Sequence, residues 1–261
     1  MMHLGSGGGL YPLAGLLVGL LVGLTGVGGG SLMTPILVLL FGVHPVTAVG
    51  TDLLQAAATK TVGTTVLGCG RAIEWRIVGL LASGSVPASA LTILGLAYGM
   101  KNAATAHVIP ILLGLAVIMT AIAVLFRGPL LRLSQVTVHR LTRRRAAQLT
   151  SLAGVLLGVL VTITSVGAGA LGVVFLAFLY PGLPTSRIVA ADIAHAVPLT
   201  LLAGLGHWWL GSINWPLLGA LLMGSIPGIV IGSLLVTRVP ERVLRPVLAL
   251  VLIIVGGKLI F

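Results

Sequence analysis

Two short glycine-containing runs, one in each half of the chain, have the residue types best suited to binding an anion. The first is Thr25-Gly26-Val27-Gly28-Gly29-Gly30-Ser31, and the second is Thr164-Ser165-Val166-Gly167-Ala168-Gly169. Glycine lets the backbone approach a ligand closely, and free amide groups at the start of a helix are electropositive. The hydroxyl groups in both runs add hydrogen-bond donors. Close helix packing through small residues is the competing interpretation.

Polar side chains inside apolar segments form a second group of candidates. Segment 46–67 contains Asp52, Gln55 and Lys60, and segment 184–207 contains Asp192 and His195 at matching places. Charges inside an apolar span are costly and face the protein interior or a water path. Lys60 either attracts an anion or pairs with an aspartate, and His195 is either a proton carrier or a packing histidine. A position at the membrane interface is the alternative for both aspartates, and His207 is predicted to be interfacial.

No enzyme or metal signature accompanies these residues. The chain has only four acidic residues in total, and it lacks Ser–His–Asp, HExxH and CxxC arrangements and a P-loop lysine. Cys69 is the only cysteine, so no intrachain disulfide can form. The sequence therefore predicts a protein that is not an enzyme and that has no metal site and no cofactor.

The candidate residues recur because the chain is duplicated. A shift of 139 residues maps Thr25 onto Thr164, and a shift of 140 maps Asp52 onto Asp192 and Pro87 onto Pro227. The two prolines are predicted to kink matching helices, and a fixed kink is favoured over a hinge or an element that shapes the surroundings of the site. A duplicated half that carries a glycine-interrupted apolar segment is typical of secondary transporters, whose site lies at the repeat interface.

Composition places most of the chain in a lipid bilayer. Hydrophobic residues make up 57% of the sequence and charged residues 7%, with a mean hydropathy of +1.19. Soluble domains carry about 25% charged residues. Apolar segments long enough to span lipid recur along the whole length, which leaves no room for a soluble domain. The first residues lack the basic stretch of a cleaved signal peptide, so none is predicted.

The spans allow two topologies, which differ at segments 11–41 and 146–180. Each of these is too long for one crossing and is interrupted by its glycine run. They either cross the membrane as broken helices, giving eight crossings, or enter and leave on one side as re-entrant hairpins. The second topology leaves only Lys101 and Lys258 on the less basic face, which the positive-inside rule favours. It has three further spans in each half, so the two repeats are inverted.

The charge distribution predicts the domain organisation. The net charge is +11, and six arginines lie between Arg127 and Arg145. In a membrane protein such a loop is cytoplasmic, so nucleic-acid binding is not expected. The sequence therefore predicts a first repeat over 1–126, a basic loop over 127–145 and a second repeat over 146–261. The termini would face the periplasm, and the partners would be the bilayer and a small anion, with a homo-oligomer left open.

The motifs resemble one known family of membrane proteins. Gly26-Val27-Gly28-Gly29-Gly30-Ser31 followed by Pro35, then Gly50-Thr51-Asp52 and Ser165-Val166-Gly167-Ala168-Gly169, look like the TauE/SafE family of transporters. The resemblance covers essentially the whole chain, although Ala168 stands where the first run has glycine. It implies export of sulfite, of sulfonates such as sulfoacetate or of a related small anion across the bacterial inner membrane. An anion channel and a proton-coupled importer are the alternatives.

Overall fold

A computed structural model describes residues 9–25, 30–68, 73–99, 103–126 and 142–235, with three short pieces at 249–250, 253–254 and 257–258. Within these residues all regular structure is helical. Residues 26–29 of the first glycine run, most of the basic loop 127–145 and most of segment 242–260 lie outside the described part. The predicted all-helical class is confirmed for the described residues.

The helices follow the apolar segments closely. The first half contains five, which are α1 (Leu10–Thr25), α2 (Gly30–Leu39), α3 (Pro45–Gly68), α4 (Trp75–Gly99) and α5 (Ala103–Leu125). The second half contains α7 (Arg143–Thr164), α8 (Ala170–Leu179), α9 (Thr185–Trp209) and α10 (Trp215–Leu235). Among the described residues, α4, α7, α9 and α10 are each long and apolar enough to cross a membrane.

The second glycine run interrupts the helix, as the sequence predicts. Ser165 adopts a left-handed conformation with φ 59°, and Gly167 and Gly169 have φ of 111° and 118°. Such values are strained for residues with a side chain and accessible to glycine, so the α-helix cannot continue through this stretch. The interruption is not central. α7 has 22 residues and α8 only 10, so α7 alone is long enough to cross the membrane.

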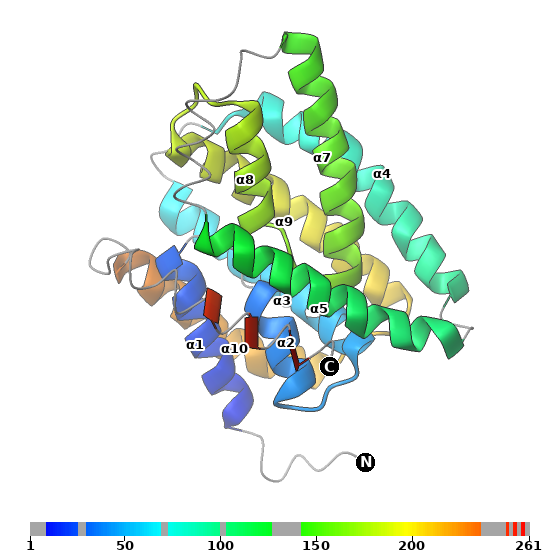
Figure 1. The fold of residues 1–261 in the computed structure, drawn as a ribbon. Helices are drawn as coiled ribbons and strands as arrows, with labels where there is room; N and C mark the ends of the chain where they lie inside the picture. The colour runs from blue at the N-terminus through cyan, green and yellow to red at the C-terminus, as the bar shows by residue number, and fades with distance from the viewer. Residues whose placement is uncertain are drawn as a thin grey trace.

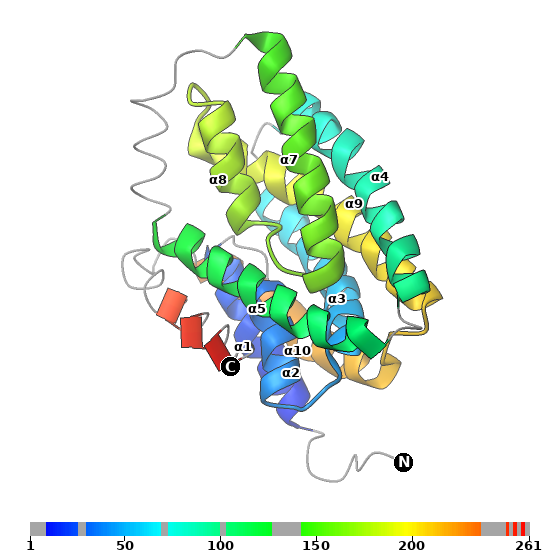
Figure 2. The same cartoon turned by 45° about the vertical axis from the view of Figure 1, so that its right-hand side comes forward.

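Each interrupted segment folds back on itself. In both views α8 runs back alongside α7 (Figures 1 and 2). α2 runs back toward the end of the molecule where α1 begins, whereas α8 runs toward the end where α7 begins. Residues Ser165 to Gly169 of the second interruption are buried.

Two long helix pairs join the halves through glycine. α1 packs along α10, and α4 packs along α7. In the first pair Gly19 lies directly against the backbone carbonyl of Ser225, and in the second Gly158 lies against that of Ser85. Any side chain would separate these backbones, which is the reason small residues recur at such membrane interfaces. α3 and α9 pack against each other between the two pairs.

The duplicated prolines do not face the interior. Pro87 in α4 and Pro227 in α10 are both exposed, while the residues that follow each of them are buried. Their rings therefore point away from the buried polar residues of the interior. They lie on the outer face of their helices, where lipid would surround them.

Candidate functional site

The intramembrane polar residues of both halves meet in the interior. Asp52 and Asp192 are 0% exposed, Gln55 3%, Lys60 6% and His195 1%. α3 supplies three of these side chains and α9 supplies the other two, because these two helices pack together at the centre. Both aspartates are therefore surrounded by protein and not by lipid or water. A buried charge is tolerated only when it has compensating partners, so the contacts of each group matter.

Asp52 connects α3 to both interrupted segments. The Thr34 hydroxyl of α2 donates a hydrogen bond of 2.5 Å to Oδ2 of Asp52. The second oxygen, Oδ1, is buried without a hydrogen bond of good geometry, as is the Ser165 hydroxyl in the interruption between α7 and α8. The two groups lie close enough to interact. Asp52 therefore joins the first half-helix pair to the second.

Asp192 occupies the corresponding place in the second half. Its Oδ1 atom lies directly over Gly172 of α8, where a Cβ atom would overlap it. Each aspartate thus packs against the half-helix that follows the interruption in its own repeat. The absence of a side chain at Gly172 is what gives Asp192 this position.

Lys60 reaches across the interface between the halves. Its ammonium donates a hydrogen bond of 3.4 Å to the carbonyl of Ala168 in the second interruption, 108 residues away. Coulomb interactions also connect it with Asp192 and Asp52. In this structure Lys60 contacts the unwound backbone and interacts with both aspartates, as the second of its two predicted alternatives requires.

The second interruption presents backbone amides rather than side chains. The amides of Gly167, Ala168 and Gly169 donate no hydrogen bond to any described group. The Val166 and Ala168 side chains pack into hydrophobic clusters. The Thr164 hydroxyl donates to the Leu160 carbonyl at 2.6 Å and accepts from the Val166 amide at 3.1 Å, so it shapes the turn. Free amides at the N-terminus of α8 suit an oxyanion.

Of the first glycine run, the structure describes only the ends. α1 stops at Thr25 and α2 starts at Gly30, at the positions that match the ends of the second interruption. Gly26, Val27, Gly28 and Gly29 lie outside the described residues, and the side chains of Thr25 and Ser31 are likewise not described.

Both buried histidines are held by hydrogen bonds. His195 Nε2 lies 2.7 Å from the Ser85 hydroxyl of α4. His207 Nε2 lies 2.9 Å from the Thr162 carbonyl of α7, and this histidine is 1% exposed. His207 lies near the end of α9, as a span-end residue does, and its ring is buried against α7. In contrast, the four tryptophans are all more than half exposed, as an aromatic belt requires.

Comparison with known proteins agrees with this arrangement. Residues 11–259 match the family described as Sulfite exporter TauE/SafE. The chain belongs to the TauE/SafE family. It is 39% identical over 252 residues to the "Probable membrane transporter protein YjnA" of Bacillus subtilis (strain 168), covering 95% of this chain and 98% of the relative. No solved structure matches the chain. The protein is thus a TauE/SafE membrane transporter, embedded in lipid through its apolar helices.

Three residues of this TauE/SafE chain take part in the polar cluster without having been singled out from the sequence. They are Thr34, which binds Asp52, Ser85, which binds His195, and Gly172, which underlies Asp192. The duplication offered a partial signal, since Ser85 and Ser225 match under the shift of 140 and both are fully buried.

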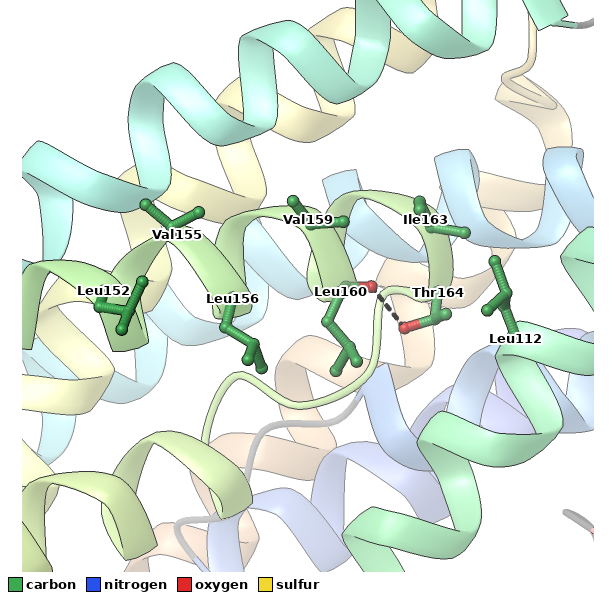
Figure 3. A pocket seen from close by; sticks show the side chains of 8 residues that line it. All are labelled: Leu112, Leu152, Val155, Leu156, Val159, Leu160, Ile163 and Thr164. Carbon is green, nitrogen blue, oxygen red and sulfur yellow. Dashed lines mark hydrogen bonds between the residues drawn. The ribbon is translucent and has the colours of Figure 1, made fainter. Parts of the chain in front are cut away.

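An apolar groove lies on the outer surface of the TauE/SafE fold and is distinct from the cluster. Leu112 of α5 and seven residues of α7 line a hollow of about 370 Å³ (Figure 3). Among the described lining residues only Thr164 bears a hydroxyl, and this hydroxyl donates to the Leu160 carbonyl. None of the described lining residues is charged, so this part of the groove suits hydrocarbon and not an anion.

Proposed function

We propose that this TauE/SafE protein is a secondary transporter that moves a small sulfur-containing anion across the bacterial inner membrane by alternating access. Sulfite and sulfonates such as sulfoacetate are the proposed substrates. One observation carries the proposal. In the interior, three amides that donate to no described group and the Ser165 hydroxyl lie beside an ammonium group, Lys60, which comes from the other half of the chain.

These groups form the donor set that an oxyanion needs. Amide and hydroxyl donors preorganised in a buried site bind negative charge more strongly than they would in water. In the described state Lys60 interacts with both aspartates. An anion bound at the amides would therefore compete with Asp52 and Asp192 for the Lys60 ammonium. The first run, Thr25 to Ser31, is proposed to supply the matching half of the site.

An inverted repeat with re-entrant hairpins accounts for the helix contacts. Under the shifts of 139 and 140, α1 corresponds to α7 and α4 to α10, so the α1–α10 and α4–α7 pairs are equivalent. The opposite directions in which the two hairpins open support the same two-fold relationship (Figure 2). With this topology loop 127–145 is cytoplasmic and both termini are periplasmic. A site between inverted repeats can be exposed to the two sides in turn.

Export is the direction that the membrane potential favours. Moving one charge through 100 mV changes its free energy by about 2.3 kcal/mol. The free energy of a dianion therefore falls by about 4.6 kcal/mol for each 100 mV when it leaves a negative-inside cell. Export of such an anion needs no coupling ion, whereas import needs protons or sodium. Asp52, Asp192 and His195 are the buried groups that could carry a proton in an importer.

Transport by purified protein in proteoliposomes tests the proposal. A thermal-shift screen against sulfite, sulfate, thiosulfate, sulfoacetate, taurine and small carboxylates first identifies the ligand, because binding raises the melting temperature. Lys60→Ala is expected to abolish transport of that ligand, while Lys258→Ala, at an exposed lysine, should leave it unchanged. Transport by the Lys60 variant at the wild-type rate would remove this residue from the site.

The kinetics separate the carrier from its alternatives. A carrier saturates with substrate and exchanges labelled for unlabelled anion, whereas a channel does neither. Export driven by an imposed potential supports the proposed direction. A flux that ignores the potential and follows the pH gradient would instead assign the protein as a proton-coupled importer.

A further inference from the structure

A second hollow with a different chemistry opens at the end of the molecule where the α7–α8 hairpin opens. It has a volume of about 500 Å³. The start of α4 contributes Glu74 and Arg76, the start of α7 contributes Arg143, and the connection from α8 to α9 contributes Tyr180 and its neighbours as far as Leu183. We call this hollow the basic vestibule.

The charges of the basic vestibule do not cancel. The Glu74 carboxylate is neutralised by Arg187, with which it forms an ion pair of 3.0 Å. Among the described residues no carboxylate pairs with Arg76 or Arg143, so two guanidinium groups border the hollow with free donors. Guanidinium groups bind planar or tetrahedral oxyanions through paired hydrogen bonds. Tyr180, whose hydroxyl lies 2.8 Å from that of Thr150, adds a polar edge.

The fold itself does not require these charged residues, because the equivalent positions at the other hairpin opening lack them. Under the same shifts Glu74 and Arg76 correspond to Asn214 and Pro216. Thr150 and Tyr180 correspond to Tyr11 and Phe41, and those two rings pack together at 4.7 Å. One hairpin opening thus has an aromatic pair, and the other has two arginines that pair with no described carboxylate.

We propose that the basic vestibule is a binding site for a small oxyanion from the aqueous phase, separate from the buried cluster. Anions that carry several oxygens on one centre, such as sulfate or a sulfonate, fit its two guanidinium groups. Binding of an anion in the basic vestibule does not depend on the proposed transport function. Only the further step, in which the bound anion moves on to the buried cluster, rests on that function. The site would give one face of the carrier a higher local anion concentration than the other.

Trp75 provides a reporter that does not depend on transport. It is 69% exposed and stands between Glu74 and Arg76 in sequence, while the other three tryptophans lie at the end of α9 and the start of α10. Trp208→Phe, Trp209→Phe and Trp215→Phe together leave Trp75 as the only tryptophan. Quenching of its fluorescence by iodide, at constant ionic strength in maltoside micelles, then measures anions near the basic vestibule.

Sulfate and sulfoacetate are expected to protect Trp75 from iodide in a saturable manner, and chloride is not. Arg76→Gln with Arg143→Gln should abolish this protection and lower iodide quenching about twofold or more, as the loss of two nearby charges implies. Arg144→Gln with Arg145→Gln is the matched control, since both residues are exposed in the first turn of α7 and neither lines the hollow. The proposal would be overturned if both double variants lost the protection of Trp75 equally, or if chloride protected Trp75 as well as sulfate does.

Two further measurements separate the remaining outcomes. Protection that persists in phosphatidylcholine nanodiscs but disappears in phosphatidylglycerol nanodiscs would assign the arginines to lipid head groups and overturn the proposal. In proteoliposomes the Arg76–Arg143 variant should show a raised KM from that face with an unchanged kcat. If the wild-type protein transports no anion, the proposed function fails, and the Trp75 measurement still decides on the basic vestibule.

Discussion

The contact between Gly172 and Asp192 gives the sharpest test of the buried cluster. In Gly172→Ala the new methyl group would overlap Oδ1 of the aspartate, so the carboxylate must move. Overpacking of this kind costs about 1–3 kcal/mol. Alanine is about 1 kcal/mol better than glycine inside a helix, which offsets part of that cost. The expected net loss in free energy of unfolding is therefore about 0–2 kcal/mol, together with loss of transport.

The stability cost is measured by SDS-induced unfolding of the purified protein in mixed micelles, and transport is measured in proteoliposomes. Gly79→Ala is the matched control, because a Cβ atom at this helical position meets nothing within 4 Å. Gly79→Ala should raise the free energy of unfolding through the better helix propensity of alanine, and it should leave transport activity unchanged. Asp192→Ala in the Gly172→Ala background should remove the overpacking cost, since the clashing atom is gone. If the cost is the same with and without the aspartate side chain, the clash is not its cause.

Three further substitutions have defined outcomes. Gly19→Val should separate α1 from α10 at the Ser225 carbonyl and destabilise the protein by about 1–3 kcal/mol in the same SDS titration, and an unchanged midpoint would contradict the close approach. Ser85→Ala leaves the buried His195 Nε2 without its partner and should cost about 1–3 kcal/mol in that titration, whereas a neutral result would assign the hydrogen bond no weight. Ser165→Gly relieves a left-handed residue and should stabilise the turn by about 1 kcal/mol, while it weakens anion binding in a thermal-shift assay; unaltered binding would remove this hydroxyl from the site.

The sequence predicted the features that depend on local pattern. The helix boundaries and the interruption after Thr164 follow from apolar length and from glycines that tolerate positive φ. The burial of Asp52 and Asp192 was only one of two alternatives, because distance along a helix does not tell whether lipid or protein surrounds it. For the same reason the sequence did not show that the His207 ring is buried, where its Nε2 atom lies 2.9 Å from the Thr162 carbonyl of α7.

The pairing within the cluster could not be read from one chain. Thr34 and Ser85 are ordinary small residues in sequence, and they matter only because α2 and α4 bring them to Asp52 and His195. The duplication identified equivalent positions, but it did not show that Lys60 crosses from its own half to the Ala168 carbonyl. Contacts of this kind depend on tertiary packing, which two-fold equivalence alone does not specify.

The pairing of α1 with α10 also constrains how the protein is made. α1 has a glycine-lined face whose partner, α10 (Trp215–Leu235), is synthesised only after all the other labelled helices. Until α10 is synthesised, that face of α1 is exposed to lipid or contacts the insertion machinery. Because α10 of the second half packs along α1 and α4 of the first half packs along α7, neither half completes its packing alone. Two separately expressed halves should therefore be degraded singly and accumulate together.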